Sequence, residues 1–241
     1  GGDAPGMNAA IRAVVRTGAY YGVKVCGVMR GYNGLINGEI QDMSPRDVSE
    51  VLQRGGTCLM TARCKKFKTK AGVERACHIA RVFGLDGLVV VGGDGSFRGA
   101  KDLSNAGVPT IAMPGTIDND INCSEYTIGY DTCLNTVKDA VDKIRDTSAS
   151  HERCTVIEVM GRNAGYIAIN TGLATGAVGI AIEEFPFDIE GTIAKMKELK
   201  KAKKRNFIVI VSEAFGKDFS ENLAKRIEKE TEIETKFARL A

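Results

Sequence analysis

Three aspartates stand in short segments rich in glycine, threonine and asparagine, GGDGS and PGTIDND. Asp94 follows two glycines after an apolar run, an arrangement that lets backbone amides approach a phosphate while the carboxylate binds a divalent cation. In the second segment, Asp118 could accept a proton from a hydroxyl nucleophile while Asp120 helps to organise the metal. The same residue types also suit tight turns and caps. The chemistry that this pattern could perform is phosphoryl transfer.

Phosphoryl transfer also needs amides and cations that face the phosphates. The opening segment, GGDAPGMNAAIR, places glycines before a helical pattern, where free amides would bind an anion, although a simple tight turn is the alternative. Glu213 ends the apolar run FIVIVS, where a carboxylate either faces a ligand crevice or caps a helix. Candidate cations, each of which could equally be an ordinary surface arginine, are Arg63, Arg153 and Arg162.

The composition is that of a globular protein: of 241 residues, 44% are apolar and 26% are charged, and the net charge is +3. No apolar run approaches the ~20 residues that a bilayer requires. The charge excess is too small to indicate nucleic-acid binding, and the densest basic run, 195–205, is interpreted as a solvated helix face. Seven cysteines with no C-x-x-C pair are typical of buried free thiols in a reducing compartment.

Short apolar runs alternate with segments of helical spacing, which predicts α/β architecture with mostly parallel sheets covered on both faces. The predicted strands are 23–29, 87–91, 109–113, 154–160, 177–182 and 207–214. The predicted helices are 7–21, 71–83, 97–105, 133–146, 189–203 and 221–229. A further helix is predicted in SPRDVSEVL, with Ser44 as its N-cap and Pro45 in its first turn.

A long polar interval, 114–132, separates two α/β series, and such intervals are usually functional or cross between domains. We therefore predict two Rossmann-like three-layer domains, 1–129 and 130–241, with an active-site cleft between them where loops at the carboxyl ends of strands converge. The opening glycines would normally follow a strand, and no initiator methionine is present. We therefore expect a fragment, truncated at both ends.

Five segments, in order, closely resemble the 6-phosphofructokinase family: GGDAPGMNAAIR, GGDGS, PGTIDND, DTSASH and EVMGRNAG. The resemblance extends over essentially the whole chain. It implies transfer of the ATP γ-phosphoryl group to the 1-hydroxyl of fructose 6-phosphate with Mg²⁺, a step of glycolysis that gives fructose 1,6-bisphosphate and ADP. It also implies that 1–129 binds ATP, that 130–241 is an incomplete domain for fructose 6-phosphate, and that the protein is a cytoplasmic homotetramer whose subunits share sites.

By the same resemblance, Asp118 would be the base toward the sugar hydroxyl, Asp94 would bind the metal and Asp120 would support this network. Thr116 and Arg162 would steady the transferring phosphoryl group. The residues that would line the ATP site are Gly2, Tyr32, Arg63, Gly95, Ser96 and Gly99. Those that would hold the sugar phosphate are Thr116, Asp118, Asp120, Arg153, Met160, Gly161, Arg162, Glu213 and Lys236. The resemblance further implies that Arg153 reaches the site of a neighbouring subunit.

The chain departs from the family pattern in several places. Lys236 stands where bacterial members usually have an arginine. The lysine keeps the positive charge but cannot bind a phosphate through two parallel hydrogen bonds, a loss for which Arg239 could compensate. The chain also ends before the histidine and arginine that complete the sugar-phosphate pocket in the family. Pro45 and Val178 replace an arginine and a glutamate of a family site for an allosteric effector, a nucleotide diphosphate or phosphoenolpyruvate. The residues that match this effector site are Arg12, Arg16, Arg145 and Lys204.

The phosphoryl donor can be argued from two glycines. Pyrophosphate-using relatives typically carry an aspartate at the position of Gly95 and a lysine at that of Gly115, and a side chain at Gly95 would intrude where the α-phosphate of a nucleotide lies. We therefore expect ATP. The alternatives are a pyrophosphate-dependent enzyme and a non-catalytic nucleotide-binding subunit. A dinucleotide-binding oxidoreductase fits less well, because Gly99 falls out of step with the G-x-G-x-x-G pattern.

Overall fold

The computed structural model describes residues 1–216 and 218–240 of the chain. Its backbone contacts divide it into two units. Unit 1 comprises Gly1–Ile117 and Ile121–Tyr130, and unit 2 comprises Asp118–Asp120 and the chain from Asp131 onward. The predicted polar interval is thus where the chain crosses between the units, and it delivers Asp118 and Asp120 to unit 2. The assignment of ATP to one part and the sugar phosphate to the other stays a prediction.

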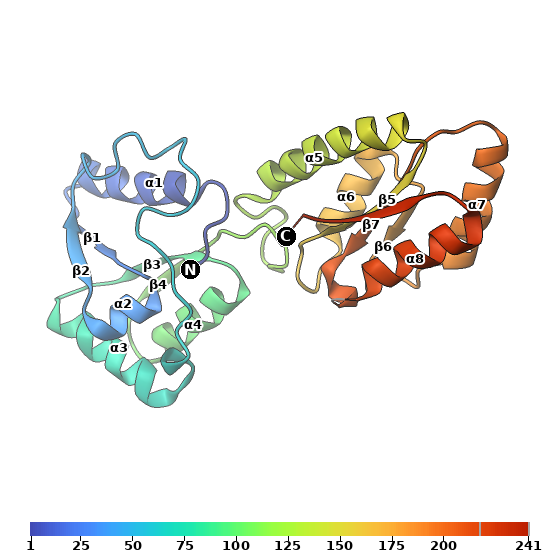
Figure 1. The fold of residues 1–241 in the computed structure, drawn as a ribbon. Helices are drawn as coiled ribbons and strands as arrows, with labels where there is room; N and C mark the ends of the chain where they lie inside the picture. The colour runs from blue at the N-terminus through green and yellow to red at the C-terminus, as the bar shows by residue number, and fades with distance from the viewer. Residues whose placement is uncertain (217, 241) are drawn as a thin grey trace. The chain divides into compact units, whose positions relative to one another are not determined.

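Unit 1 contains two small sheets. In one, β1 (Val25–Val28) pairs antiparallel with β2 (Ile40–Met43); in the other, β3 (Leu88–Gly92) pairs parallel with β4 (Thr110–Pro114), with Leu88 opposite Thr110 (Figure 1). The helices are α1 (Met7–Tyr20), α2 (Tyr32–Asn37), α3 (Lys70–Val82) and α4 (Asp94–Asn105), with a 3₁₀ turn, η1 (Lys66–Lys68). Buried side chains from α2, η1, α3 and α4 form one apolar cluster, and α1 packs on buried Val48 and Val51 in another.

Unit 2 is built on a four-stranded parallel sheet with the order β6-β7-β5-β8. Its strands are β5 (Cys154–Val159), β6 (Gly179–Ala181), β7 (Phe207–Ser212) and β8 (Thr235–Leu240), and a 3₁₀ turn, η2 (Glu213–Phe215), follows β7. The helices are α5 (Tyr130–Ser150), α6 (Tyr166–Thr175), α7 (Ile189–Lys201) and α8 (Phe219–Thr231).

The sheet of unit 2 is covered on both faces. Apolar residues of α7 and α8 pack on alternate residues of the strands, among them Val156 and Val209. Figure 1 shows α5 and α6 on the other side of this sheet. Every residue of β5 and β7 is buried, which is why these strands were recognisable as continuous apolar runs. The prediction of α/β architecture with mostly parallel sheets is confirmed.

Most predicted elements are present, but their ends differ. The segment predicted as a helix at 133–146 is part of the longer α5. Because α5 begins at Tyr130, the last residues of the polar interval 114–132 are helical. Four elements were not predicted: α2, β2, α6 and β8. The helix α6, YIAINTGLAT, is apolar on nearly all sides and therefore lacks the polar face that marks a surface helix. The strand predicted at 23–29 is antiparallel to its partner, whereas the others pair in parallel.

The helix predicted in SPRDVSEVL is wrong. Residues 45–50 form consecutive turns, with the backbone amides of Asp47 and Ser49 bonded three residues back. The Asp47 carboxylate accepts hydrogen bonds from the Ser44 amide and hydroxyl, each at 2.7 Å, so Ser44 is a donor to a turn and not a helix cap. Burial of Val48 and Val51 against α1 supplies the three-residue spacing that resembles a helix.

Two further predictions are settled by burial. The lysines and the arginine of the run 195–205 are exposed along α7 and the loop after it, as predicted, while Met196 between them is buried. All seven cysteines are free, but Cys77 and Cys154 alone are fully buried and Cys123 is exposed, so the prediction that the thiols are buried is wrong for most of them. Within the described residues, no helix is both long and apolar enough to cross a membrane.

Candidate active site

The glycine-rich corner between β3 and α4 is packed too closely for side chains. A Cβ on Gly92 would lie 2.6 Å from the carbonyl oxygen of Gly1 and would also collide with the Ser96 hydroxyl. A Cβ on Gly93 would approach Thr116 to 3.3 Å. The opening residues, the start of α4 and the end of the β4 segment therefore meet at one point of unit 1. The glycines allow this approach, and they leave the first-turn amides of α4 uncovered by side chains.

Asp94 is the first residue of α4, where a carboxylate interacts favourably with the helix dipole. Its Oδ1 accepts a hydrogen bond from Arg98 Nε at 3.0 Å, one turn along the helix. The side chain is partly exposed, so this pair is weak enough to exchange for a ligand. Asp94 and the amides around Gly95 thus form a carboxylate beside an anion-binding helix start.

Three of the predicted ATP-site residues lie together next to this corner. Tyr32, the first residue of α2, donates its hydroxyl to the Ser96 carbonyl oxygen at 2.5 Å, and burial raises its pKa. A Cβ on Gly99 would lie 2.5 Å from the Tyr32 ring and 2.9 Å from Phe67. The rings of Tyr32 and Phe67 stack at 4.0 Å, nearly parallel at 3°. Phe67 is a residue that the sequence argument missed; its only signal was an isolated aromatic in a basic segment.

The remaining predicted ATP-site residues lie on exposed backbone of the same unit. Gly2 has a positive φ of 88°, and its amide donates to the Thr61 hydroxyl at 2.9 Å. Arg63 follows two residues later in an exposed segment without regular structure. Around a Cβ on Gly95 nothing lies within 4 Å, so the space beside this residue is open.

The polar interval returns along the end of β4 before it leaves unit 1. The Ile128 amide donates to the Pro114 carbonyl oxygen at 2.8 Å, and the buried Thr127 hydroxyl donates to the Thr116 carbonyl oxygen at 2.6 Å. Thr116 is itself buried. These bonds fix the backbone of the segment that carries Thr116, and Thr127 is a supporting residue that the sequence argument did not single out.

The two aspartates of the interval flank Asn119, whose φ of 53° lies in the left-handed region that few residues other than glycine adopt. Such strained positions persist where the surroundings fix them, and they are common at functional sites. Asp120 Oδ2 lies 4.0 Å from Arg162 Nη1, and its Oδ1 is buried without a hydrogen-bond partner among the described residues. Burial raises the pKa of Cys133 in the first turns of α5, and the nearby Asp118 carboxylate adds to the effect.

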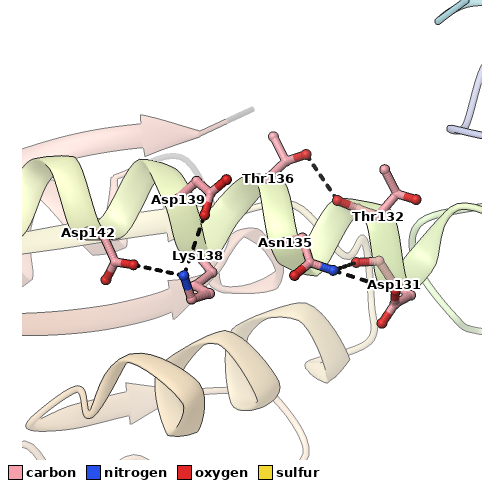
Figure 2. A network of polar contacts seen from close by, with 7 residues as sticks. All are labelled: Asp131, Thr132, Asn135, Thr136, Lys138, Asp139 and Asp142. Carbon is pink, nitrogen blue, oxygen red and sulfur yellow. Dashed lines mark hydrogen bonds and ion pairs between the residues drawn. The ribbon is translucent and has the colours of Figure 1, made fainter. Parts of the chain in front are cut away.

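The helix α5 that follows carries a row of polar contacts on its exposed side (Figure 2). Lys138 Nζ bonds Asp142 at 3.0 Å and Asp139 at 3.4 Å, and the Asn135 side chain donates to the Asp131 carbonyl oxygen at 3.0 Å. The two contacts between residues four apart, Lys138 with Asp142 and Asn135 with Asp131, each stabilise the helix by about a few tenths of a kcal/mol. They support the long helix whose first turns place Cys133 near Asp118.

The loop after β5 is held by the acid that follows β7. Glu213 Oε1 accepts hydrogen bonds from the amides of Gly161, at 3.1 Å, and Arg162, at 2.7 Å. Gly161 and Arg162 both have positive φ, 139° and 58°. Met160, Gly161, Arg162 and Glu213 therefore gather at the carboxyl ends of β5 and β7, with Asp120 beside Arg162. Glu213 is not a helix cap here, because it binds the backbone of another loop.

Two predicted sugar-phosphate residues lie at the opposite ends of the same strands. Arg153 directly precedes β5, and Lys236 pairs in register with Thr155 at the start of that strand. Lys236 Nζ bonds Glu234 at 2.8 Å, and the positive charge of Arg153 also acts on this carboxylate, whose pKa is lowered chiefly by Lys236. Within one chain, unit 2 does not bring Arg153 and Lys236 together with Arg162 and Glu213.

Comparison with known proteins shows the family of this chain. The family model described as phosphofructokinase matches residues 1–241. The chain belongs to the phosphofructokinase family. Among curated relatives, an ATP-dependent 6-phosphofructokinase of Clostridium tetani is 56% identical over 236 residues, which are 98% of this chain and 73% of that protein. Its counterpart in Clostridium botulinum is 55% identical over the same lengths.

Solved phosphofructokinase structures agree with this fold. Phosphofructokinase from Saccharomyces cerevisiae superposes with a TM-score of 0.89 at 34% identity, over 100% of this chain and 37% of that chain. A pyrophosphate-dependent phosphofructokinase from Marinobacter aquaeolei gives 0.86 at 21% identity, over 99% of this chain and 66% of that one. The same fold therefore serves enzymes named for different phosphoryl donors. Family membership also removes the dinucleotide-binding oxidoreductase alternative.

The four predicted effector residues of this phosphofructokinase chain are divided between the units. In unit 1, Arg12 donates to the Val48 carbonyl oxygen at 2.7 Å, while Arg16 is exposed on α1. In unit 2, Arg145 donates to the Thr175 carbonyl oxygen, and Lys204 Nζ lies 5.8 Å from the centre of the Phe207 ring. Two of the four cations are thus already bonded to main-chain carbonyls of their own unit.

Proposed function

We propose that the protein to which this chain belongs phosphorylates the 1-hydroxyl of fructose 6-phosphate with ATP, in the cytoplasm, as a homotetramer. The observation that carries the proposal is 56% identity, over 98% of the chain, to a protein named ATP-dependent 6-phosphofructokinase. The geometry of each unit supports it. Unit 1 provides an uncovered helix start beside a carboxylate, and unit 2 provides an arginine and two acids at the carboxyl ends of its strands.

In this proposal, Asp118 accepts the proton of the sugar 1-hydroxyl as the hydroxyl attacks the γ-phosphorus. Thr116 and Arg162 bind oxygens of the group in transfer, and Asp120 orients Arg162, to which it is already close. Glu213 holds the loop that contains Met160 and Gly161 against the sugar. Positioning and charge neutralisation of this kind account for most of the catalysis of phosphoryl transfer.

The residues around Asp94 fit a magnesium ion. Among the described residues, no group of three or more His, Cys, Asp or Glu side chains could hold a metal by itself. Mg²⁺ is usually bound in kinases by one or two carboxylates together with substrate phosphates and water. Asp94 beside open backbone amides matches that requirement. When bound, the ion would neutralise charge on the β- and γ-phosphates.

Gly95 and Gly115, the two glycines at which pyrophosphate-using relatives carry other residues, support ATP as the donor for different physical reasons. Beside Gly95 the space is open, as a nucleotide phosphate requires. Gly115 is crowded: a Cβ there would lie 2.8 Å from Met7 Sδ and 2.9 Å from Val91 Cγ1. A lysine at this position would therefore clash with the packing of unit 1 itself. The pyrophosphate-dependent alternative is not favoured, because the relatives named for ATP share over half of their residues with this chain.

The positions of Arg153 and Lys236 support an assembly that shares its sites. Arg153 lies at the amino end of β5 and Lys236 near that of β8, whereas Arg162 and Glu213 follow the carboxyl ends of β5 and β7. This separation favours a role for both cations outside the sugar site of their own chain. In the proposed tetramer they bind the phosphate of the sugar in a neighbouring subunit. Allosteric control through the four effector residues stays a prediction, and velocity curves unaffected by ADP and phosphoenolpyruvate would contradict it.

A panel of donors and acceptors tests the proposal on the complete protein. ATP and pyrophosphate are each combined with fructose 6-phosphate, fructose and glucose 6-phosphate, with and without Mg²⁺. We expect turnover with ATP, fructose 6-phosphate and Mg²⁺ together. A preference for pyrophosphate would overturn the donor assignment. Tight ATP binding without turnover on any acceptor would instead favour the non-catalytic subunit.

A further inference from the structure

A charge pair between two strands of unit 2, of which only the acid is buried, has no part in the proposed catalysis. Glu158 on β5 and Arg239 on β8 lie directly opposite each other in the parallel register. Arg239 Nε bonds Glu158 Oε1 at 2.6 Å. The Glu158 side chain is 5% exposed, whereas that of Arg239 is 44% exposed. This pair therefore differs from the other ion pairs of the unit, most of which lie on the surface.

The surroundings of Glu158 make its charge dependent on Arg239. The residues that precede it on the same face of β5, Cys154 and Val156, belong to the apolar core beneath α8. Glu158 Oε2 is buried with no hydrogen-bond partner among the described residues. The carboxylates of Glu221 and Asp218, at the start of α8, also act on Arg239. Arg239 is therefore the cation that balances a cluster of acids.

The pair sits at the base of the loop that the proposed sugar site uses. Glu158 precedes Met160, Gly161 and Arg162 by only two to four residues. In the sheet, β5 lies between β7 and β8. Glu213, after β7, holds the loop from one side through two amides, and Arg239, on β8, holds the end of β5 from the other side through Glu158. The end of β5 is thus fixed by both neighbouring strands.

We propose that Arg239 is a positioning residue: by binding Glu158, it fixes the end of β5 and thereby the loop at 160–162 that contacts the sugar phosphate. This inference rests on the proposed function of that loop. The sequence suggested that Arg239 could compensate for the lysine at position 236 by binding the sugar phosphate. The positioning role is different from that one. Arg239 faces the core beneath α8 near the carboxyl end of the sheet, whereas Lys236 lies near the amino end.

The test uses variants of the complete protein. Arg239→Met keeps the aliphatic stem but removes the charge, Arg239→Lys keeps the charge, and Arg205→Met is the matched control in an exposed pair with Glu152. We expect Arg239→Met to raise the KM for fructose 6-phosphate about 10-fold, the scale of a lost hydrogen bond to a charged group, with the KM for ATP unchanged. Arg239→Lys should restore most of the affinity, and the control should behave as wild type.

A double variant separates positioning from simple stabilisation. Arg239→Met would leave the buried charge of Glu158 uncompensated, so it should lower the Tm, and adding Glu158→Gln should recover much of that loss. The raised KM for fructose 6-phosphate should persist in the double variant, because the bond between the strands is still absent. Recovery of both quantities together would overturn the proposal. Equal changes in the KM for ATP and for the sugar would also overturn it.

The Tm gives a readout that does not need turnover. Without its cation, Glu158 keeps a buried carboxylate that no charge compensates. The lowered Tm of Arg239→Met should therefore largely recover when Glu158→Gln is added. A Tm that stays equally low in the double variant would contradict the pairing. If wild type fails to use fructose 6-phosphate, the proposed function fails, but this Tm test still stands.

Discussion

At the scale of single residues, the chemistry of the candidate site depends on carboxylates in two different settings. Asp94 is partly exposed at the start of α4 and paired with Arg98, a setting that suits the exchange of ligands. Asp118 and Asp120 belong to a strained segment, with Asn119 in the left-handed region between them. The first setting suits a metal ligand, and the second suits groups whose orientation must be fixed before reaction.

We expect Asp118→Ser to lower kcat by at least ~10²-fold, the usual scale for the loss of a general base. Affinity for ATP should change little, because Asp118 is proposed to act on the sugar hydroxyl and not to bind the nucleotide. Steady-state kinetics together with equilibrium ATP binding would measure both quantities. Near-normal turnover would remove Asp118 from the role of base.

The two donor-related glycines offer a matched pair of substitutions. Gly115→Ala should lower the free energy of unfolding by about 1–3 kcal/mol, because its Cβ would overpack against Met7 and Val91. Gly95→Ala meets nothing within 4 Å and should leave stability unchanged. It should instead weaken ATP binding, because it fills space proposed for a phosphate. Denaturant unfolding would measure the stability of both variants, and ATP titration would measure their affinity for ATP. Equal stability of the two variants would show that Gly115 is not constrained by packing.

At the scale of elements, the loop after β5 shows how strands define a site. The amides of Gly161 and Arg162 donate to the carboxylate of Glu213, which follows the neighbouring strand β7. The segments EVMGRNAG and FIVIVSEA are therefore bonded to each other at the site. Charge-assisted hydrogen bonds of this kind are roughly twice as strong as neutral ones. The conformation of the loop therefore depends on the register between β5 and β7 as well as on its own residues.

Glu213→Gln should raise the KM for fructose 6-phosphate about 10-fold, because a neutral amide binds the two loop amides less strongly. The KM for ATP should stay the same, since Glu213 bonds the loop proposed to hold the sugar. Glu152→Gln, at an exposed position, is the matched control. If Glu213→Gln and Glu152→Gln have the same KM for fructose 6-phosphate, Glu213 does not organise the loop.

Periodicity predicted the elements that have one polar and one buried face or that are buried on both faces. It identified α1, α3, α7, β5 and β7 with small errors at the ends. It failed for α6, which is apolar almost all round, and for SPRDVSEVL, where buried valines three residues apart stand in turns. In both cases the pattern reflects tertiary packing, which periodicity alone does not distinguish from local structure.

At the scale of the whole molecule, the proposed substrate residues of unit 2 fall at two ends of one parallel sheet. This arrangement makes assembly part of the proposed catalysis. Arg153 Nε is buried with no hydrogen-bond partner among the described residues, and the adjoining Nη2 bonds only weakly, at 3.3 Å, to the Thr147 hydroxyl. Such a group is suited to bind an anion from outside its own chain.

Complementation between two inactive variants would test this sharing. Arg153→Ala and Asp118→Ser should each be nearly inactive alone as complete proteins. In mixed oligomers, some sites would combine an intact Asp118 from one subunit with an intact Arg153 from its neighbour. We therefore expect co-expression to recover measurable activity. Mixed oligomers as inactive as their parents would indicate that both residues serve the same chain's site.

The sequence by itself determined the α/β class, the family and the acids proposed for the chemistry. Glycine-flanked carboxylates and buried apolar runs are local patterns of consecutive residues, so they can be recognised without the fold. The tertiary structure decided which residues share a location. It placed Phe67 against Tyr32, bonded Glu213 to the loop after β5, paired Arg239 with Glu158, and set Lys236 at the opposite end of the sheet. These contacts depend on strand order and register, which bring together residues up to 81 positions apart and leave no local pattern in the sequence.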